Sequence, residues 1–467
     1  MKHVDMRLII AMGLGGLCVF SMAVMLYRFS YKPTWVAFAL STPGMICALS
    51  LGGLSIAVAT FSHRYRRIGE SNPKESVRSV VVGGMVLAGI LIVGEVGLRF
   101  ATVMQPWGEK LGSVPLLPRG WGQVVVRYKY MLDVFKMKSN YFVEDSVLGW
   151  TVGFGRSSEN GLWNSSAEGV RSPTRGAVYS QNPVSCRIAL LGDSFTFGWQ
   201  ATYEETWGAS LQEQLGASCQ VLNFAVPGYS IGQMYLRYER DVTAWEPDVV
   251  VLSFTNGAPE RTMGIYCFLM MPDWECPWAA PRFSLDKDRL ELLNVPLSAT
   301  REIYQYRAIY DLPHIEYDWW YRPWQWEQPY WGLIYSSYLF RLATSYYPLY
   351  EFPRPEATND RMQAINEALL QAFVEKTRVK RSSFLVLYLP GKDDYLDANV
   401  EPSSHGLLRS AQLAFIDATP CLGKVPSDQR FRLAGAHYAP EGERAVASCV
   451  LPYIKDRLAA MNKWEIS

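Results

Sequence analysis

An apolar run that ends in a glycine-bounded polar turn indicates the fold class of this chain. Arg187–Leu191 is a short aliphatic run, and Gly-Asp-Ser-Phe-Thr-Phe-Gly follows it directly at 192–198. Such a run predicts a buried parallel strand, and the polar residues after it predict a turn into a helix. Ser194 would then lie at the carboxyl edge of a sheet, where open α/β folds place their chemistry and helix amides face negative charge. The alternative is a serine that only caps the next helix.

The alternation of strand and helix continues to the end of the chain. The sequence predicts strands at Arg187–Leu191, Gln220–Ala225, Asp248–Phe254, Ser383–Leu389 and Ala414–Asp417, and helices at Thr206–Leu215, Gly232–Thr243, Asp360–Thr377 and from Pro440 onward. Strands separated by helices predict an α/β domain with a flavodoxin-like parallel sheet and helices on both faces. We expect this domain to occupy residues 185–467.

Three apolar stretches precede this domain, at about 8–27, 35–61 and 80–98. Each is long enough to cross a bilayer, so we expect three transmembrane helices with the lipid bilayer as a partner. The loop between the second and third stretches carries five basic residues and the first loop carries two. Basic loops stay in the cytoplasm. We therefore expect a multi-pass protein of the cytoplasmic (inner) membrane whose C-terminal domain lies on the periplasmic or extracellular side. Glu95, the one carboxylate in these stretches, either has a specific role or reaches the membrane interface.

Two regions after the apolar stretches do not fit the alternation. Residues 101–184 are rich in Gly, Ser and Pro and are expected to form a membrane-proximal linker and leader. Residues 258–350 form an aromatic-rich insertion that includes Trp319–Trp326. This insertion can fold upon itself as a lid, contact the membrane interface or a membrane protein partner, or stack on sugar rings.

Charge and cysteine spacing exclude several classes of function. A net charge of +1 with 19% charged residues gives no reason to expect a nucleic-acid partner. The cysteines show no C-x-x-C spacing, so neither a metal site nor a redox centre is expected. Nothing in the sequence indicates an organic cofactor.

Six cysteines follow the apolar stretches, and an even number permits pairing. Cys186 and Cys219 precede the first two strands, which should be parallel neighbours about 4.8 Å apart, a separation that a disulfide accepts. The same reasoning offers two further pairs, with unpaired thiols as the alternative throughout: Cys267 with Cys276 and Cys421 with Cys449.

An activated serine needs a base and donors for the developing oxyanion. His437 is better placed than His314 or His405, because it lies just before the helix that Pro440 opens, where the helix dipole favours a neutral imidazole. Gly228 follows the second strand and Asn256 follows the third. The amides of Ser194 and Gly228 and the side chain of Asn256 are therefore candidate oxyanion donors.

These residues resemble those of the SGNH (GDSL-type) hydrolases, and in particular membrane-anchored bacterial members. Gly192-Asp193-Ser194, Gly228, Asn256 and His437 stand for the four blocks that give the family its name. Leu148-Gly149-Trp150 and Pro281–Leu285 add to the likeness, which covers about residues 145–458 and is interrupted by the aromatic insertion. The resemblance implies small acyl esters as substrates, such as acetyl groups on envelope glycans.

Two of the blocks depart from the family pattern. The third block usually reads Gly-x-Asn-Asp, but Phe254 and Gly257 replace the Gly and the Asp here. The family usually has Asp three residues before the histidine, and this chain has Ala434. The imidazole must then be oriented by a backbone carbonyl, by a distant acid, or by nothing.

Two functions follow. The first is a membrane-anchored serine esterase or O-acyl(acetyl)transferase that acts on ester groups of an extracytoplasmic glycan or lipid through an acyl-enzyme, with Ser194 as nucleophile and His437 as base. The alternative is a catalytically degenerate SGNH-like domain that serves as a binding or assembly module of a membrane complex. The reactivity of Ser194 separates them.

Overall fold

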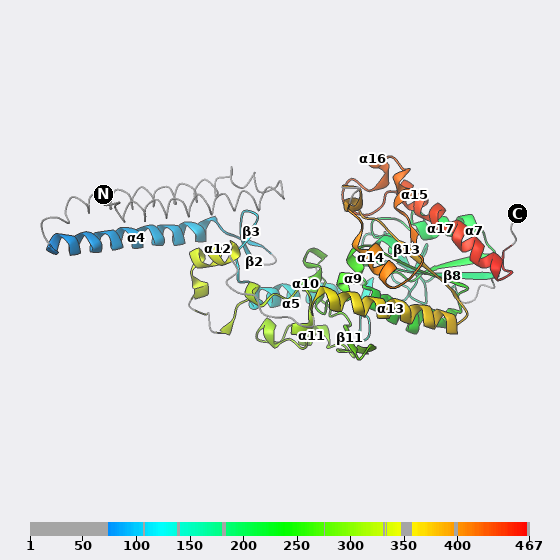
Figure 1. Ribbon diagram of the computed structural model, residues 1–467, viewed down its shortest axis with the longest axis horizontal. Helices are drawn as coiled ribbons and strands as arrows, with labels where there is room; N and C mark the ends of the chain where they lie inside the picture. The colour runs from blue at the N-terminus through cyan, green and yellow to red at the C-terminus, as the bar shows by residue number, and fades with distance from the viewer. Residues whose placement is uncertain are drawn as a thin grey trace, which may run out of the picture. The chain divides into compact units, whose positions relative to one another are not determined.

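The computed structural model describes residues 73–105, 108–137, 141–179, 184–274, 276–329, 332, 334–346, 357–396 and 400–464 (Figure 1). The chain divides into two compact units, of which the first comprises Met1–Val124 and Arg322–Phe352 and the second Val125–Tyr321 and Pro353–Ser467. The expected spans at 8–27 and 35–61 lie outside the described residues.

Helix α4 (Pro73–Ala101) is the longest element among the described residues of the first unit and contains the third apolar stretch. In the part of the chain that the structure describes, no helix combines the length and the apolar character needed to span a membrane. A small antiparallel sheet follows α4, formed by β1 (Val103–Gln105), β2 (Gly108–Leu111) and β3 (Val114–Pro115).

Glu95 of α4 holds the amino end of helix α12 (Tyr338–Tyr346) in the first unit. Its carboxylate accepts hydrogen bonds from the amides of Tyr338 at 2.8 Å and Leu339 at 3.0 Å. The Ser337 hydroxyl donates to it at 3.1 Å. The first amides of a helix have no partner within the helix, and a carboxylate there also interacts favourably with the dipole. Glu95 therefore fixes α12 against α4.

The second unit is built on a seven-stranded sheet. Its order is β14 (Ile416–Asp417), β13 (Ser383–Tyr388), β10 (Val249–Phe254), β8 (Cys186–Leu191), β9 (Cys219–Asn223), β7 (Arg171–Ser172) and β6 (Asn164–Ser165). The first five are parallel in the expected flavodoxin-like order. The last two run antiparallel at the edge, so the sheet is mixed. Both edge strands come from residues 101–184, which were expected to be linker and leader.

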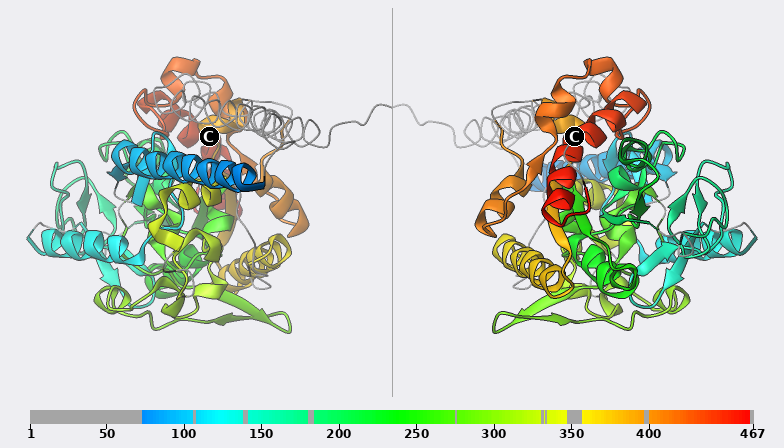
Figure 2. Two further views of the ribbon diagram at one scale, coloured as in Figure 1. Left: turned by 90° about the vertical axis from the view of Figure 1, so that its left-hand side faces the viewer. Right: turned by 90° about the vertical axis from the view of Figure 1, so that its right-hand side faces the viewer.

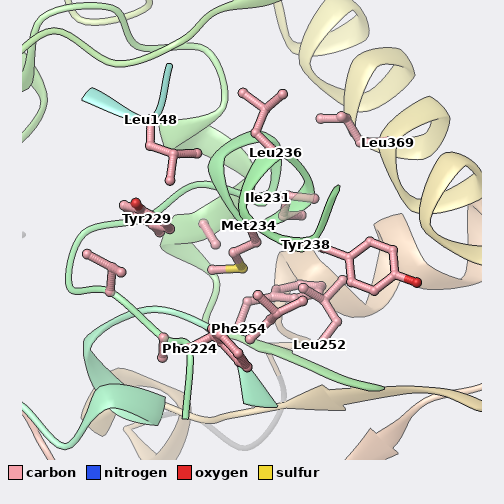
Figure 3. Close-up of a cluster of buried hydrophobic side chains, with 14 of the residues drawn as sticks. Leu148, Phe224, Tyr229, Ile231, Met234, Leu236, Tyr238, Leu252, Phe254 and Leu369 are labelled. Atoms are coloured by element: carbon pink, nitrogen blue, oxygen red, sulfur yellow. The ribbon is translucent and has the colours of Figure 1, made fainter. Parts of the chain in front are cut away.

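Helices cover both faces of this sheet because strand side chains alternate. Val250, Leu252 and Phe254 of β10 pack in one cluster with α8 (Ile231–Arg237) and α13 (Asn359–Val379) (Figure 3). Val249 and Val251 pack in the other, with α7 (Trp207–Leu215) and α17 (Pro440–Ala460). Figure 1 shows α13 and α17 on opposite sides of the sheet.

Two predicted elements differ in length. The helix expected at Gly232–Thr243 is α-helical only as α8, and a π-helical turn at Tyr238–Val242 continues it. The strand expected at Ala414–Asp417 is reduced to β14, which pairs with the last two residues of β13.

Most of the aromatic insertion packs within the second unit. The side chains of Tyr266, Phe268 and Tyr304 are buried, and Trp319 and Trp320 pack against the main core. The hairpin formed by β11 (Phe283–Asp286) and β12 (Arg289–Leu292) packs against α13 (Figure 2). The part of the insertion from Arg322 onward belongs to the first unit.

The structure confirms the three predicted disulfides. Cys186 and Cys219 are register partners at the starts of β8 and β9, with Cα atoms 4.6 Å apart. The other two pairs are Cys267 with Cys276, at a Cα separation of 5.5 Å, and Cys421 with Cys449, at 5.9 Å.

Candidate active site

Ser194 opens a four-residue helix, α6 (Ser194–Phe197), immediately after strand β8. Asp193 caps this helix, and its side chain accepts a hydrogen bond from the amide of Phe195 at 3.1 Å. The capping role that a serine often takes therefore falls to Asp193. Ser194 is half-buried at the first helical position, so its hydroxyl is available for chemistry.

Buried hydrogen bonds fix α6 to the strands on either side of β8. The hydroxyl groups of Thr196 and Ser253 lie 2.6 Å apart, and Ser253 donates to the carbonyl of Leu191 at 2.8 Å. On the other side, the Asn223 side chain donates to the carbonyl of Thr196 at 2.7 Å. These hydrogen bonds hold helix α6, and with it Ser194, in a fixed position.

His437 contacts Ser194 directly. Its Nε2 lies 2.8 Å from the Ser194 hydroxyl oxygen, and its ring packs against Phe195 with the ring centres 4.7 Å apart. Burial lowers the pKa of the imidazole below its usual value of 6.5; Asp193 opposes this shift and Arg432 adds to it. A neutral imidazole at this distance can take the serine proton.

The second ring nitrogen of His437 faces an amide. Nδ1 lies 3.1 Å from Oε1 of Gln200, and the Gln200 side chain donates through Nε2 to the carbonyl of Ala434 at 2.7 Å. Ala434 is the position at which the family pattern has Asp. Gln200 carries no sequence signature, because a single glutamine six residues after a serine is commonplace. Only the fold shows its place in the site.

Arg261 connects the loops that follow the three neighbouring strands β8, β9 and β10. It ends helix α9 (Gly257–Arg261), which follows β10. Its guanidinium pairs with Asp193 after β8 at 2.7 Å and donates to the carbonyl of Tyr229 after β9 at 3.0 Å. The Asp193 side chain is only 2% exposed, and a buried carboxylate needs such a partner. Sequence reasoning did not identify Arg261.

Gly228 lies in the loop after β9, as expected. The side chains of Met271 and Trp274 close over it, because a Cβ added at Gly228 would lie 2.7 Å from the Met271 methyl carbon and 2.9 Å from the Trp274 ring. Its φ is +78°, in the left-handed region that favours glycine.

The Leu148-Gly149-Trp150 segment supports this loop. The Trp150 indole donates to the carbonyl of Pro227 at 3.0 Å, and the Tyr229 hydroxyl donates back to the Trp150 carbonyl at 2.6 Å. The Leu148 carbonyl accepts a hydrogen bond at 2.8 Å from Gln233 in α8. The family-like segment upstream of the sheet therefore positions the loop that carries Gly228.

Asn256 is held by groups from the segments that follow strand β13. Its Nδ2 donates to Asp394 at 2.9 Å, and its Oδ1 accepts from the amide of Ser404 at 3.1 Å. Asp394 also accepts from the Tyr388 hydroxyl at 2.8 Å. The side-chain nitrogen of Asn256 carries two hydrogens, and Asp394 accepts one of them.

The other two candidate histidines have different surroundings. His405 lies on α14 (Ser403–Ser410) against the rings of Tyr388 and Phe415. His314 precedes a 3-10 turn in the insertion and packs near Tyr317. His437 is the histidine that the structure brings to Ser194.

Residues 190–255 match the model of the GDSL-like Lipase/Acylhydrolase family. This range includes Ser194, Gly228 and the end of strand β10. Asn256 and His437 lie outside it, and the structure alone places His437 beside Ser194.

The chain also resembles several solved structures. These include a lipase/acylhydrolase from Enterococcus faecalis, at 13% identity over 58% of this chain and 96% of that one with a TM-score of 0.30. Another is the psychrotrophic esterase EstA from Pseudoalteromonas sp., at 14% identity over 58% and 98% with a TM-score of 0.29. A third is an acetylxylan esterase from Geobacillus stearothermophilus, at 14% identity over 59% and 96% with a TM-score of 0.30. No curated protein matches the chain.

Proposed function

We propose that this GDSL-like hydrolase is a serine esterase or O-acyltransferase that works through an acyl-enzyme. The observation that carries the proposal is the 2.8 Å contact between the Ser194 hydroxyl and Nε2 of His437 at the carboxyl end of the central strand β8. A nucleophile within hydrogen-bond reach of a neutral base is the arrangement that acyl transfer requires. The family match over residues 190–255 agrees with it.

The first half of the reaction forms the acyl-enzyme. Ser194 attacks the ester carbonyl carbon while its proton passes to Nε2 of His437. The amides of Ser194 and Gly228 and the Asn256 side chain stabilise the oxyanion of the tetrahedral intermediate. This intermediate collapses as the bond to the alcohol oxygen breaks, and His437 returns the proton to the leaving alcohol.

The second half releases the acyl group. Water, or the hydroxyl group of an acceptor, attacks the carbonyl carbon of the acyl group bound to Ser194. His437 accepts the proton of the attacking hydroxyl. The bond to the Ser194 oxygen then breaks, and His437 reprotonates that oxygen. Hydrolysis and transfer differ only in the attacking hydroxyl. We propose a small acyl ester of an extracytoplasmic glycan or lipid as the donor.

We place the second unit outside the cytoplasm, anchored by the apolar stretches at 8–27, 35–61 and 80–98. The support is the hydropathy of these stretches and the five basic residues in one loop against two in the other. The three disulfides of the second unit add to it, because disulfides persist in oxidising compartments.

Labelling with a fluorophosphonate probe tests the proposal on the full-length protein in detergent. We expect wild type to be labelled and to release nitrophenol from p-nitrophenyl acetate, and Ser194→Ala to do neither. His437→Ala should be labelled about 10²-fold to 10⁴-fold more slowly, since it lacks the base. Ser210→Ala on α7 is the control and should behave as wild type. Folded wild type that takes up no probe would overturn the enzymatic proposal and favour the degenerate binding or assembly module.

A further inference from the structure

Gln200 occupies the place at which a catalytic triad has its third member. Its Oε1 lies 3.1 Å from Nδ1 of His437, and Nε2 of the same ring lies 2.8 Å from the Ser194 hydroxyl oxygen. The three side chains therefore form one hydrogen-bonded row. They come from the turn after β8 and from the loop before α17.

Two hydrogen bonds determine which end of the Gln200 amide faces the histidine. The Ala434 carbonyl can only accept, so the group 2.7 Å from it must be the NH2 end of Gln200. The main-chain N–H of His437 can only donate, and it points at Oε1 at 3.4 Å. The oxygen of Gln200 therefore faces Nδ1, which must carry a hydrogen. Nε2 is then the unprotonated nitrogen, as a general base for Ser194 requires.

Gly435 is shaped to receive this amide. A Cβ at Gly435 would lie 2.3 Å from Oε1 and 2.4 Å from Nε2 of Gln200, and the residue has a φ of +124°. Any other residue would displace Gln200 or the loop. Lys392 holds the same loop by donating hydrogen bonds from its ammonium group to the carbonyls of Arg432 and Gly435.

We infer that Gln200 is a positioning residue that completes a Ser194–His437–Gln200 triad and fixes the histidine tautomer without supplying a negative charge. The inference rests on the proposed function, since a tautomer matters only if His437 acts on Ser194. A neutral amide orients the ring as a carboxylate would. It does not stabilise the imidazolium that forms during attack, so the base stays weak and neutral.

The charges around His437 come from several elements. Asp193 precedes Ser194, and Arg432 lies in the histidine's own loop, paired at 2.7 Å with Glu205. Lys392 reaches the carbonyl of Gly435 from the turn after β13. Nδ1 of His437 faces the neutral amide of Gln200, so a carboxylate at position 200 would place a negative charge directly beside Nδ1.

Gln200→Leu and Gln200→Glu separate orientation from charge. Gln200→Leu should lower kcat by about 10²-fold to 10⁴-fold with KM within about twofold, by analogy with the loss that a wrong tautomer causes in serine proteases. Gln200→Glu keeps an oxygen that can accept a hydrogen bond from Nδ1. It should raise the apparent pKa at which kcat/KM falls on the acidic side, because a carboxylate favours the imidazolium. Gln212→Leu on α7 removes a similar amide-to-backbone bridge away from the site and should leave both constants unchanged.

The tautomer itself is measured by NMR on protein labelled with 15N-histidine. The chain has five histidines, and His437→Ala identifies the signal. Wild type should show Nδ1 protonated and Nε2 free, and Gln200→Leu should lose this preference. The inference would be overturned if wild type had Nε2 protonated. It would also be overturned if Gln200→Leu kept the activity and the tautomer of wild type. The NMR measurement does not depend on turnover. An inactive wild type would count against the proposed function, and the effect of Gln200 on the His437 tautomer could still be measured.

Discussion

Burial keeps the imidazole of His437 neutral. Burial lowers the pKa of the imidazole, and Asp193, whose charge opposes this shift, is itself paired with Arg261. A base with a lowered pKa stays unprotonated to a more acidic pH than a free histidine does. The pH dependence of the reaction therefore reports on this one residue.

We expect kcat/KM to fall with decreasing pH, with an apparent pKa below 6.5. His437 must be neutral to take the Ser194 proton, so activity is full above the pKa of the imidazole and is lost as the pH falls through it. Rates with p-nitrophenyl acetate between pH 4.5 and 8 measure this limb. An acidic limb centred at or above pH 7 would contradict the buried, neutral histidine.

A second prediction concerns Gly149, which has a φ of +84° and lies so close to Ala279 that an added Cβ would be 2.1 Å from its carbonyl oxygen. Gly149→Ala should lower the free energy of unfolding by roughly 2 to 4 kcal/mol, from backbone strain and overpacking together. Gly406→Ala is the control, since an added Cβ there meets nothing within 4 Å, and in a helix it should be neutral or slightly stabilising. Urea unfolding gives both values. Equal stability of the two variants would be inconsistent with the close approach at Gly149.

At the scale of elements, helix α17 joins the site to the core. The His437 loop leads into its first turn, and Glu443 in that turn accepts a hydrogen bond from the amide of Trp207, the first residue of α7, at 2.9 Å. Burial raises the pKa of Glu443 to about 8, and the bond from Trp207 opposes this rise only in part. Glu443 is therefore largely protonated in the folded protein at neutral pH.

Glu443 should make the protein less stable as the pH rises. Its carboxyl group binds a proton more tightly when folded than when unfolded, so the free energy of unfolding falls between about pH 4.5 and 8. The slope reaches up to about 1.4 kcal/mol per pH unit. Glu443→Gln should remove this slope, while Glu441→Gln in the same turn should keep it. Chemical unfolding at pH 5 and pH 8 makes the comparison; a pH slope that survives in Glu443→Gln would refute the assignment.

The elements that the sequence predicted are those with a strong local pattern. The parallel strands and the helices α7, α13 and α17 each have a regular apolar period and a clear turn or cap, and their bounds agree to within a few residues. Strands β6 and β7 have two residues each, which is too short for any period. The roles of Gln200 and Arg261 depend on contacts between distant loops, so no local pattern marks them. Ser194 and His437 stand out because their immediate neighbours already indicate a turn and a helix start.

For the whole molecule, we expect an orientation that places the second unit outside the cytoplasm. Protease added to intact spheroplasts should digest the second unit, because the loop rich in basic residues is expected inside. Membrane fractions probed for the carboxyl-terminal end give the result, with a cytoplasmic protein as the protected control. Full protection of the second unit, with a known external protein digested, would reverse the topology.

The disulfides should contribute to the stability of the second unit. Replacing Cys186 and Cys219 together with Ser should lower its free energy of unfolding by about 2 to 4 kcal/mol, since the unfolded chain gains freedom. Calorimetry of the double variant against wild type measures the loss. Free alkylation of Cys186 in denatured, unreduced wild type would contradict the pairing.

The order of the paired cysteines along the chain predicts how the disulfides form during maturation. Each of the three bonds joins two cysteines that follow one another in the sequence, at 186 and 219, 267 and 276, and 421 and 449. A chain threaded through a translocon presents its thiols in that same order. An oxidase that joins each new thiol to the one before it would therefore reach the native set directly, and maturation of this protein should require an oxidant but no disulfide isomerase.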